Sequence, residues 1–256
     1  MSAGSTANLG DRAIVRIGGP HAAAFLQGLI TNDVGLLESQ PAIFAGLLSP
    51  QGKVLFEFLA AKDGEAFLVA VARPAAADLV KRLSMYKLRA KVEIELKADL
   101  VSQAFAQDPR LPSLDAITAN YDAHRIAVGV PEGGKDYALG GLFPHEAMFD
   151  QLHGVSFTKG CYVGQEIVSR MQHRGTARSR FLIVDAEAPL PAVGTPVLAG
   201  DTPLGEMGSS VGTQGLALIR LDRLADAYAA RNPITAGGVP LRLSKPGYAT
   251  FEVPAP

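Results

Sequence analysis

The sequence predicts an α+β protein in which a mixed N-terminal domain, residues 1–175, precedes a small C-terminal β-barrel, residues 176–256. Between residues 12 and 97, apolar strand-like segments alternate with two amphipathic helical patterns. A further helical pattern follows the only cysteine of the chain, Cys161. After Gly175 the composition changes to short apolar segments separated by glycine turns, which is typical of a small barrel.

Length and composition limit the function classes. A chain of 256 residues with a net charge of −1 is long enough for two domains and has no overall positive charge with which to attract nucleic acid. One cysteine excludes an internal disulfide framework, and the five histidines match no standard zinc pattern. Because Met1–Asp11 lacks the features of a signal or transit peptide and no apolar segment is long enough to span a membrane, we expect a soluble cytoplasmic protein.

The N-terminal domain contains the strongest secondary-structure patterns. We expect strands at 12–17, 42–48, 54–61, 66–72 and 92–96, and helices at 22–30 and 74–88. Ser49-Pro50-Gln51-Gly52-Lys53 predicts a tight connection between antiparallel strands. This succession predicts a ferredoxin-like subdomain at about residues 42–97.

The middle of the chain gives weaker patterns. Val101–Gln107 and Arg125–Val130 predict two more strands, and Phe143–Ala147 predicts a short helix opened by a proline. The glycine-containing stretch at 132–136 predicts a flexible loop, either a lid or an exposed turn.

The stretch Lys159-Gly160-Cys161-Tyr162-Val163-Gly164-Gln165-Glu166 is the chemical centre of the sequence. A thiol just before a helix meets unpaired backbone N–H groups and the positive end of the helix dipole, and a nearby ammonium strengthens this field. Both favour thiolate over thiol, so an exposed Cys161 would be reactive. The alternative is that Cys161 is a small buried hydrophobic residue, as most free cysteines are.

Three other positions have both a structural and a functional interpretation. Thr31-Asn32-Asp33 follows a helical pattern and is typical of a simple turn. Glu57 lies in an apolar strand, either on a solvated face or at a site. Glu146 lies in the first turn of the short predicted helix, where the helix dipole favours a carboxylate.

Residues 159–166 resemble the signature of the YgfZ-type folate-binding proteins, which are relatives of the glycine-cleavage T-protein, an aminomethyltransferase. Phe25–Gly28 followed by Thr31-Asn32-Asp33 is similar to the corresponding stretch of both groups, where the loop lies beside a folate pocket. By this resemblance Glu57 occupies the position of a catalytic aspartate and Glu146 that of a glutamate that binds the pterin ring. Gln165 and Arg170 would bind the glutamate tail or orient the loop.

The resemblance implies a tetrahydrofolate-binding accessory factor for the maturation or repair of iron–sulfur enzymes, with an indirect effect on tRNA modification. Its partners would be a reduced folate and, transiently, iron–sulfur proteins or their assembly machinery, without direct nucleic-acid or membrane binding. Cys161, activated by Lys159, would accept a one-carbon or sulfur group, or contact a cluster whose other ligands come from a partner. The alternative is a folate-dependent aminomethyltransferase that uses Glu57 in place of aspartate.

Overall fold

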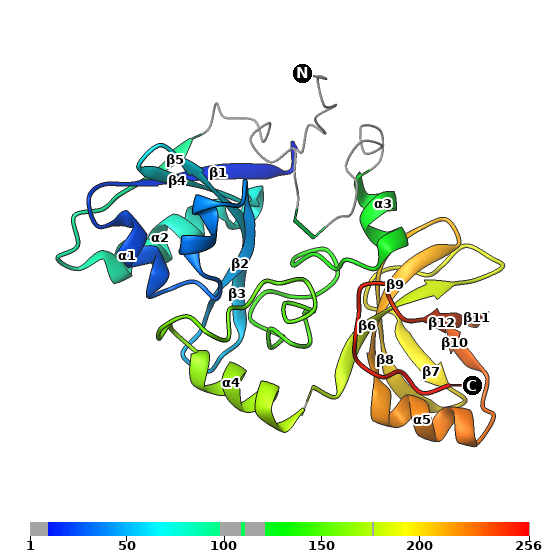
Figure 1. Ribbon diagram of the computed structural model, residues 1–256. Helices are drawn as coiled ribbons and strands as arrows, with labels where there is room; N and C mark the ends of the chain where they lie inside the picture. Colours follow the sequence, from blue (N-terminus) through cyan, green and yellow to red (C-terminus); the bar gives the residue numbers. More distant parts are fainter. Residues whose placement is uncertain (1–9, 98–108, 111–120, 176, 256) are drawn as a thin grey trace. The chain divides into compact units, whose positions relative to one another are not determined.

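The structure, a computed structural model, describes residues 10–97, 109–110, 121–175 and 177–255. The chain divides into two compact units (Figure 1), and each is made of two separate stretches of sequence. The first unit is Met1–Ala119 with Leu152–Ser169, and the second is Asn120–Gln151 with Arg170–Pro256. The chain therefore passes between the units three times, whereas the sequence pattern predicts a single boundary after residue 175.

An antiparallel sheet with strand order β2-β3-β4-β1-β5 forms the centre of the first unit. Its strands are β1 (Arg12–Gly18), β2 (Ile43–Leu48), β3 (Val54–Asp63), β4 (Ala66–Ala72) and β5 (Glu93–Lys97). The helices of this part are α1 (Ala22–Gln27), α2 (Ala76–Lys87) and the short 3-10 helices η1 (Val34–Glu38) and η2 (Arg73–Ala75). The tight turn between β2 and β3 is confirmed, since Ser49 N donates to Lys53 O over 2.8 Å.

Strands β1, β3, β4 and β5 form, with α1 and α2, a ferredoxin-like βαββαβ arrangement that β2 extends beyond β3. The arrangement begins earlier than the predicted region of about 42–97, because β1 lies between β4 and β5. Val15 of β1 pairs with Val69 on one side and with Leu96 on the other. Pairing between segments so far apart in the sequence leaves no local pattern from which to predict it.

The two faces of this sheet have different neighbours. Val15, Phe58 and Val69 point to the face that α1 and α2 cover, where Leu26 and Leu79 complete a buried apolar cluster. Removing the apolar surface of this cluster from water is the main favourable contribution to the folding of the unit. Side chains at alternate positions, such as Phe44 of β2, point to the opposite face and are also buried.

Helix α1 ends at Gln27, whereas the predicted helix continued to Ile30. The Gln27 side chain bonds the loop that follows: Nε2 donates to Asp33 Oδ1 over 3.0 Å, and Oε1 accepts from Val34 N over 3.0 Å. Ile30 pairs with Leu47 in an isolated β-bridge. Tertiary contacts thus override the helical pattern over its last residues.

The second unit contains an antiparallel sheet with strand order β11-β10-β7-β8-β9-β6-β12. Its strands are β6 (Ser179–Asp185), β7 (Pro196–Ala199), β8 (Thr202–Val211), β9 (Gln214–Arg220), β10 (Ile234–Ala236), β11 (Val239–Pro240) and β12 (Arg242–Ser244). Its helices are α3 (Tyr121–Val128) and α5 (Leu221–Ala229), while α4 (Gln165–Arg174) begins in the first unit and ends in the second. Leu182, Val197, Ala217 and Leu224 belong to its apolar core.

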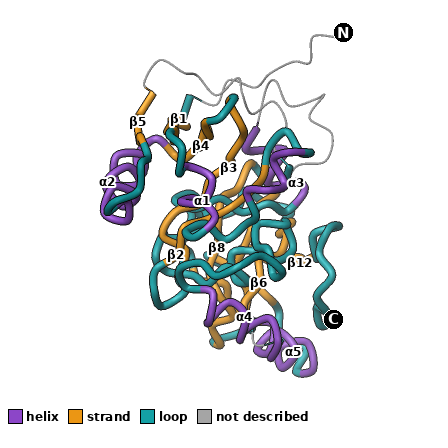
Figure 2. Tube along the Cα trace, turned by 60° about the vertical axis from the view of Figure 1, so that its left-hand side comes forward, coloured by secondary structure: helices purple, strands orange, loops and turns teal. Residues whose placement is uncertain are grey.

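The stretch between α3 and α4 has neither helix nor strand among the described residues, and Figure 2 shows it as loop. Two predictions made near it are wrong. Arg125–Val130, predicted as a strand, continues α3 to Val128, and Phe143–Ala147, predicted as a helix, is a series of turns. The predicted strand at Val101–Gln107 lies outside the described residues.

The loop at 132–136 is a turn in which Gly134 is exposed, whereas Glu132 and Asp136 at its two ends are buried. The buried Asp136 carboxylate accepts from Arg125 Nη1 over 2.6 Å and from the backbone N of Glu132 over 2.7 Å. Arg125 is itself buried in α3, and its Nε donates to Asp122 over 2.6 Å. A buried guanidinium needs such partners, so this network holds both the helix and the loop in place.

Candidate functional site

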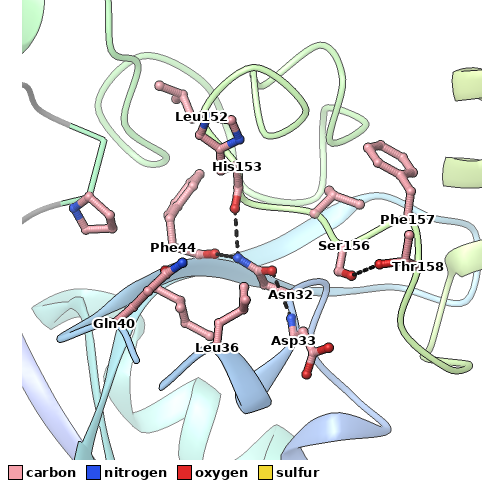
Figure 3. Close-up of a pocket in the computed structure, with 13 residues that line it drawn as sticks. Asn32, Asp33, Leu36, Gln40, Phe44, Leu152, His153, Ser156, Phe157 and Thr158 are labelled. Carbon is pink, nitrogen blue, oxygen red and sulfur yellow. Dashed lines mark hydrogen bonds between the residues drawn. The ribbon is translucent and has the colours of Figure 1, made fainter. Parts of the chain in front are cut away.

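The first unit contains a pocket of about 540 Å³ beside the Thr31-Asn32-Asp33 loop (Figure 3). Three parts of the chain line it: Asn32, Asp33, Leu36, Gln40, Ile43 and Phe44 from the first, Pro109 from the second, and Leu152, His153, Val155, Ser156, Phe157 and Thr158 from the third. Leu36 and Phe157 are large apolar side chains with 36% and 42% of their surface exposed. Sites for drug-sized ligands measure roughly 300–1,000 Å³ and combine apolar walls with a few polar groups, as this one does.

Asn32 joins two walls of the pocket. Its Nδ2 donates to the backbone oxygens of Phe44, over 2.8 Å, and of His153, over 2.7 Å, as Figure 3 shows. Its Oδ1 accepts from the backbone N of Asp33 over 2.8 Å. Both amide hydrogens are therefore used within the protein, and the side chain shapes the pocket rather than offering a donor to a ligand.

Thr31 and Asp33, which flank Asn32 in the loop, also fix its position through hydrogen bonds. Thr31 Oγ1 donates to Gly154 O over 2.6 Å and accepts from Gly46 N over 2.8 Å. Asp33 caps η1, because its Oδ1 accepts from Gly35 N over 2.9 Å. The loop is thus a fixed part of the fold and not the simple turn that its composition also allowed.

Lys159 is buried, and its ammonium is directed at this loop. Nζ donates to Ile30 O over 2.9 Å and to Asn32 O over 2.8 Å, and it lies 5.3 Å from the centre of the Tyr162 ring. Burial lowers the pKa of Lys159 to about 8, while the nearby charge of Asp33 opposes this shift. The predicted activation of Cys161 by this ammonium stays a prediction.

Cys161 is exposed, so it is not the buried hydrophobic residue of the alternative interpretation. It does not line the pocket, but it follows Phe157 and Thr158, which do, by a few residues. Gly160 beside it is also exposed, and a Cβ atom added there would meet no heavy atom within 4 Å. Neither residue is required by packing.

Gly164, near the end of the signature, packs against the turn between β2 and β3. Its φ is +82°, and a Cβ atom there would lie 2.7 Å from Ser49 O and 3.2 Å from the Cα of Gly52. Only glycine fits this close approach without strain. The side chain of Gln165 accepts from Tyr162 N over 3.3 Å, so it bonds its own loop, and its predicted role toward a folate tail stays a prediction.

Glu57 is buried in β3, which contradicts the interpretation that it lies on a solvated face. Its Oε1 lies 3.5 Å from Nη1 of the buried Arg110, whose guanidinium carbon is 4.8 Å from the centre of the Phe44 ring. Glu57 does not line the pocket, although Phe44 does. Its predicted place in folate chemistry stays a prediction.

Glu146 and Arg170 belong to the second unit. Glu146 Oε2 accepts from the backbone N of Phe143 over 2.9 Å, a local contact that closes the turns at this point. Arg170 lies on the exposed side of α4. Their predicted roles at the pterin and the glutamate tail stay predictions.

Sequence reasoning missed Gln40, His153 and Phe157 as pocket residues. They come from segments that meet through long-range contacts, such as those of Thr31 and Asn32 with residues 153–154, which no local pattern encodes. One signal was available: Phe157 is a large apolar residue between Ser156 and Thr158, two residues before the signature.

Two further observations concern only the part of the chain that the structure describes. There, no three His, Cys, Asp or Glu residues are grouped so that they could hold a metal ion. No helix in the described ranges is long and apolar enough to cross a membrane.

Comparison of structures defines the class of the protein. Glycine cleavage system aminomethyltransferase T from Bartonella henselae matches it with a TM-score of 0.72 and 13% sequence identity, over 96% of this chain and 87% of that chain. A family model described as the CAF17 C-terminal beta-barrel domain matches residues 178–251. The protein therefore has the predicted aminomethyltransferase-like fold, followed by a nearly closed C-terminal β-barrel.

Comparison of sequences then gives the family. The chain is 31% identical to the iron-sulfur cluster assembly factor IBA57, mitochondrial, of Mus musculus, with 84% of this chain and 77% of the mouse protein covered. The human IBA57 is 30% identical with the same coverage. The chain belongs to the IBA57 family of iron–sulfur cluster assembly factors.

The relatives also correct one prediction. They are named as mitochondrial proteins, which contradicts the predicted cytoplasmic location and points to mitochondria instead. The predicted role in iron–sulfur maturation is supported at the level of cluster assembly. Membership of the YgfZ type, folate binding and the effect on tRNA modification stay predictions.

Proposed function

We propose that the chain binds a reduced folate in the pocket of the first unit and uses Cys161 in the maturation of iron–sulfur proteins. The observation that carries the proposal is that one short segment forms a pocket wall and leads directly to an exposed thiol. Phe157 and Thr158 line the pocket, Lys159 holds the segment to the facing loop, and Cys161 follows in solvent.

The pocket suits a planar heterocycle with a polar edge. Phe44 and Phe157 offer aromatic faces, and Gln40 and His153 offer hydrogen-bonding groups. Asp33 provides a carboxylate whose Oδ1 already accepts from Gln27 Nε2 and Gly35 N, so its Oδ2 is the oxygen that would accept a hydrogen bond from a ring amino group or ring N–H. When bound, a reduced folate supplies a carrier of one-carbon units. The residues of the chain orient it and cover its apolar surface.

Cys161 acts on the iron–sulfur species, which is the substrate. Clusters are held by about four ligands, most often thiolates. Cys161 gives up its proton and supplies one of these ligands, while a partner iron–sulfur protein or assembly protein supplies the others. The effect on tRNA modification would be indirect, through enzymes that need such clusters.

Titration calorimetry of the purified protein with tetrahydrofolate tests the folate part. We expect saturable binding that Asp33→Asn weakens by roughly tenfold, since a hydrogen bond to a charged group contributes about 1.5–3 kcal/mol. Asp63→Asn, at an exposed carboxylate of the same unit, is the matched control and should bind as the wild type does. Glu146→Ala tests the role that the resemblance gives to that residue. Absence of binding by the wild-type protein would refute the folate proposal.

A turnover assay distinguishes the alternative function, aminomethyl transfer, from a role in iron–sulfur maturation. Transfer of a one-carbon unit from an aminomethylated carrier to tetrahydrofolate should be absent or very slow, because the Glu57 carboxylate faces Arg110 and does not line the pocket. Robust turnover that Glu57→Gln abolishes would favour the transferase over the assembly factor.

A further inference from the structure

Lys159 connects the pocket to the cysteine. Two segments form most of the pocket wall, the Thr31-Asn32-Asp33 loop and Leu152–Thr158. Lys159 directly follows the second segment, yet its ammonium is bonded to the first, at Ile30 O and Asn32 O, over 2.9 and 2.8 Å.

These two segments are also joined before Lys159. Asn32 Nδ2 donates to His153 O over 2.7 Å, Thr31 Oγ1 donates to Gly154 O over 2.6 Å, and Ser156 N donates to Thr31 O over 3.0 Å. The backbone N of Lys159 in turn donates to Ser156 Oγ over 3.1 Å. Lys159 is therefore the last of a continuous series of contacts between the two walls.

Beyond Lys159 the chain is held again at Tyr162, which is buried with its ring centre 5.3 Å from the Lys159 ammonium, and at Gly164. That glycine packs against Ser49 O, whereas Gly160 and Cys161 between them are exposed. Gly160 and Cys161 thus form a short exposed arc, and the fixed residue before it, Lys159, is bonded to the pocket wall. Any change in the relative position of the two pocket walls therefore acts on Lys159.

We propose that Lys159 is a positioning residue that transmits the occupancy of the pocket to Cys161, so that a bound ligand restrains the arc that presents the thiol. This inference rests on the proposed folate site. A ligand that contacts both walls holds them together, which keeps the two Lys159 hydrogen bonds formed and limits the motion of Gly160 and Cys161. The thiol would then be presented to a partner in one fixed position only when the pocket is filled.

Alkylation of Cys161 by N-ethylmaleimide, with and without saturating 5-formyltetrahydrofolate, tests the coupling. We expect the ligand to slow alkylation of the wild-type protein at least threefold, because the arc becomes less mobile. In Lys159→Met the rate should no longer depend on the ligand. Lys62→Met is the matched control, since Lys62 is a lysine of the same unit whose ammonium pairs with Glu38 at the surface, and it should behave as the wild type does.

The outcomes are distinguishable when binding is measured on the same samples. No folate binding refutes both the proposed function and this inference. Binding without a change in the wild-type alkylation rate refutes this inference alone, and so does a rate change that persists in Lys159→Met.

If Lys159→Met does not fold, amide hydrogen exchange of the wild-type protein with and without folate tests the coupling. Folate should then protect the amides of Ser156 and Lys159 together with those of residues 160–162. Protection confined to the pocket walls would overturn the proposal.

Discussion

Lys159 and Cys161 lie two residues apart in one segment, in opposite environments. Lys159 is 8% exposed and donates two hydrogen bonds to backbone oxygens, whereas Cys161 is exposed and no packing requirement selects it. The two glycines of the signature repeat the contrast, because Gly164 has no room for a side chain and Gly160 has open space. One continuous motif thus combines residues that build the loop with residues that the fold does not need.

The contrast between Lys159 and Cys161 indicates that some residues of the motif stabilise the fold whereas others serve function. Replacing the first kind of residue should cost stability, and replacing the second kind should cost activity alone. The expected loss in the free energy of unfolding is largest for the residue with the most buried contacts, Lys159.

Lys159→Met should have the largest effect, a loss of about 4 kcal/mol, because it leaves two backbone oxygens without their charged donor. Urea denaturation followed by circular dichroism measures it. The surface variant Lys62→Met should leave the unfolding midpoint unchanged. Equal midpoints for Lys159→Met and the wild type would show that the ammonium does not hold the loop.

Asn32→Ala tests the same contact from the facing loop, since Asn32 O is one of the two backbone oxygens bonded to Lys159. The change removes three side-chain hydrogen bonds and should cost about 3 kcal/mol. Gln40→Ala, at an exposed pocket residue, is the control in the same urea experiment. If the two variants unfold at the same urea concentration, Asn32 does not join the pocket walls.

The two glycines form a matched pair of substitutions. Gly164→Ala places a Cβ atom 2.7 Å from Ser49 O at a φ of +82° and should cost about 2 kcal/mol. Gly160→Ala should change stability by less than about 0.5 kcal/mol. Thermal unfolding of both variants checks this difference, and similar losses at both positions would contradict the contrast within the motif.

The pH dependence of stability should carry a smaller signature of the buried lysine. The pKa of Lys159 is lowered to about 8 in the folded state, so between pH 8 and the ordinary value of 10.5 the unfolded chain binds more protons than the folded one. Stability therefore rises with pH across this window relative to Lys159→Met. Urea midpoints of both proteins at pH 7.5, 8.5 and 9.5 measure the difference, and parallel profiles would contradict it.

The sequence was most informative where patterns are local. The strands of the ferredoxin-like sheet follow from apolar alternation, and the turn at Ser49–Lys53 from its proline and glycine. Helix α3 was mistaken for a strand because the short apolar run after Arg125 fits either structure. The partners that decide for the helix, Asp122 and Asp136, flank that run on both sides.

The site was predictable only in part, for the same reason. The motif identified Cys161, and the resemblance identified the loop at Asn32 and Asp33, but nothing in the sequence shows that Lys159 is directed at that loop. The contacts of Asn32 were not predictable either, because both of its amide hydrogens are used by backbone oxygens that other segments bring to it. Such contacts exist only once the chain is folded.

The central claim, that Cys161 serves function and not folding, is tested most directly by Cys161→Ala. The purified variant should unfold within about 0.5 kcal/mol of the wild type. In cells that depend on this chain, the activities of iron–sulfur enzymes should fall to the level seen without it. Full iron–sulfur enzyme activity in cells that carry only the alanine variant would contradict the account.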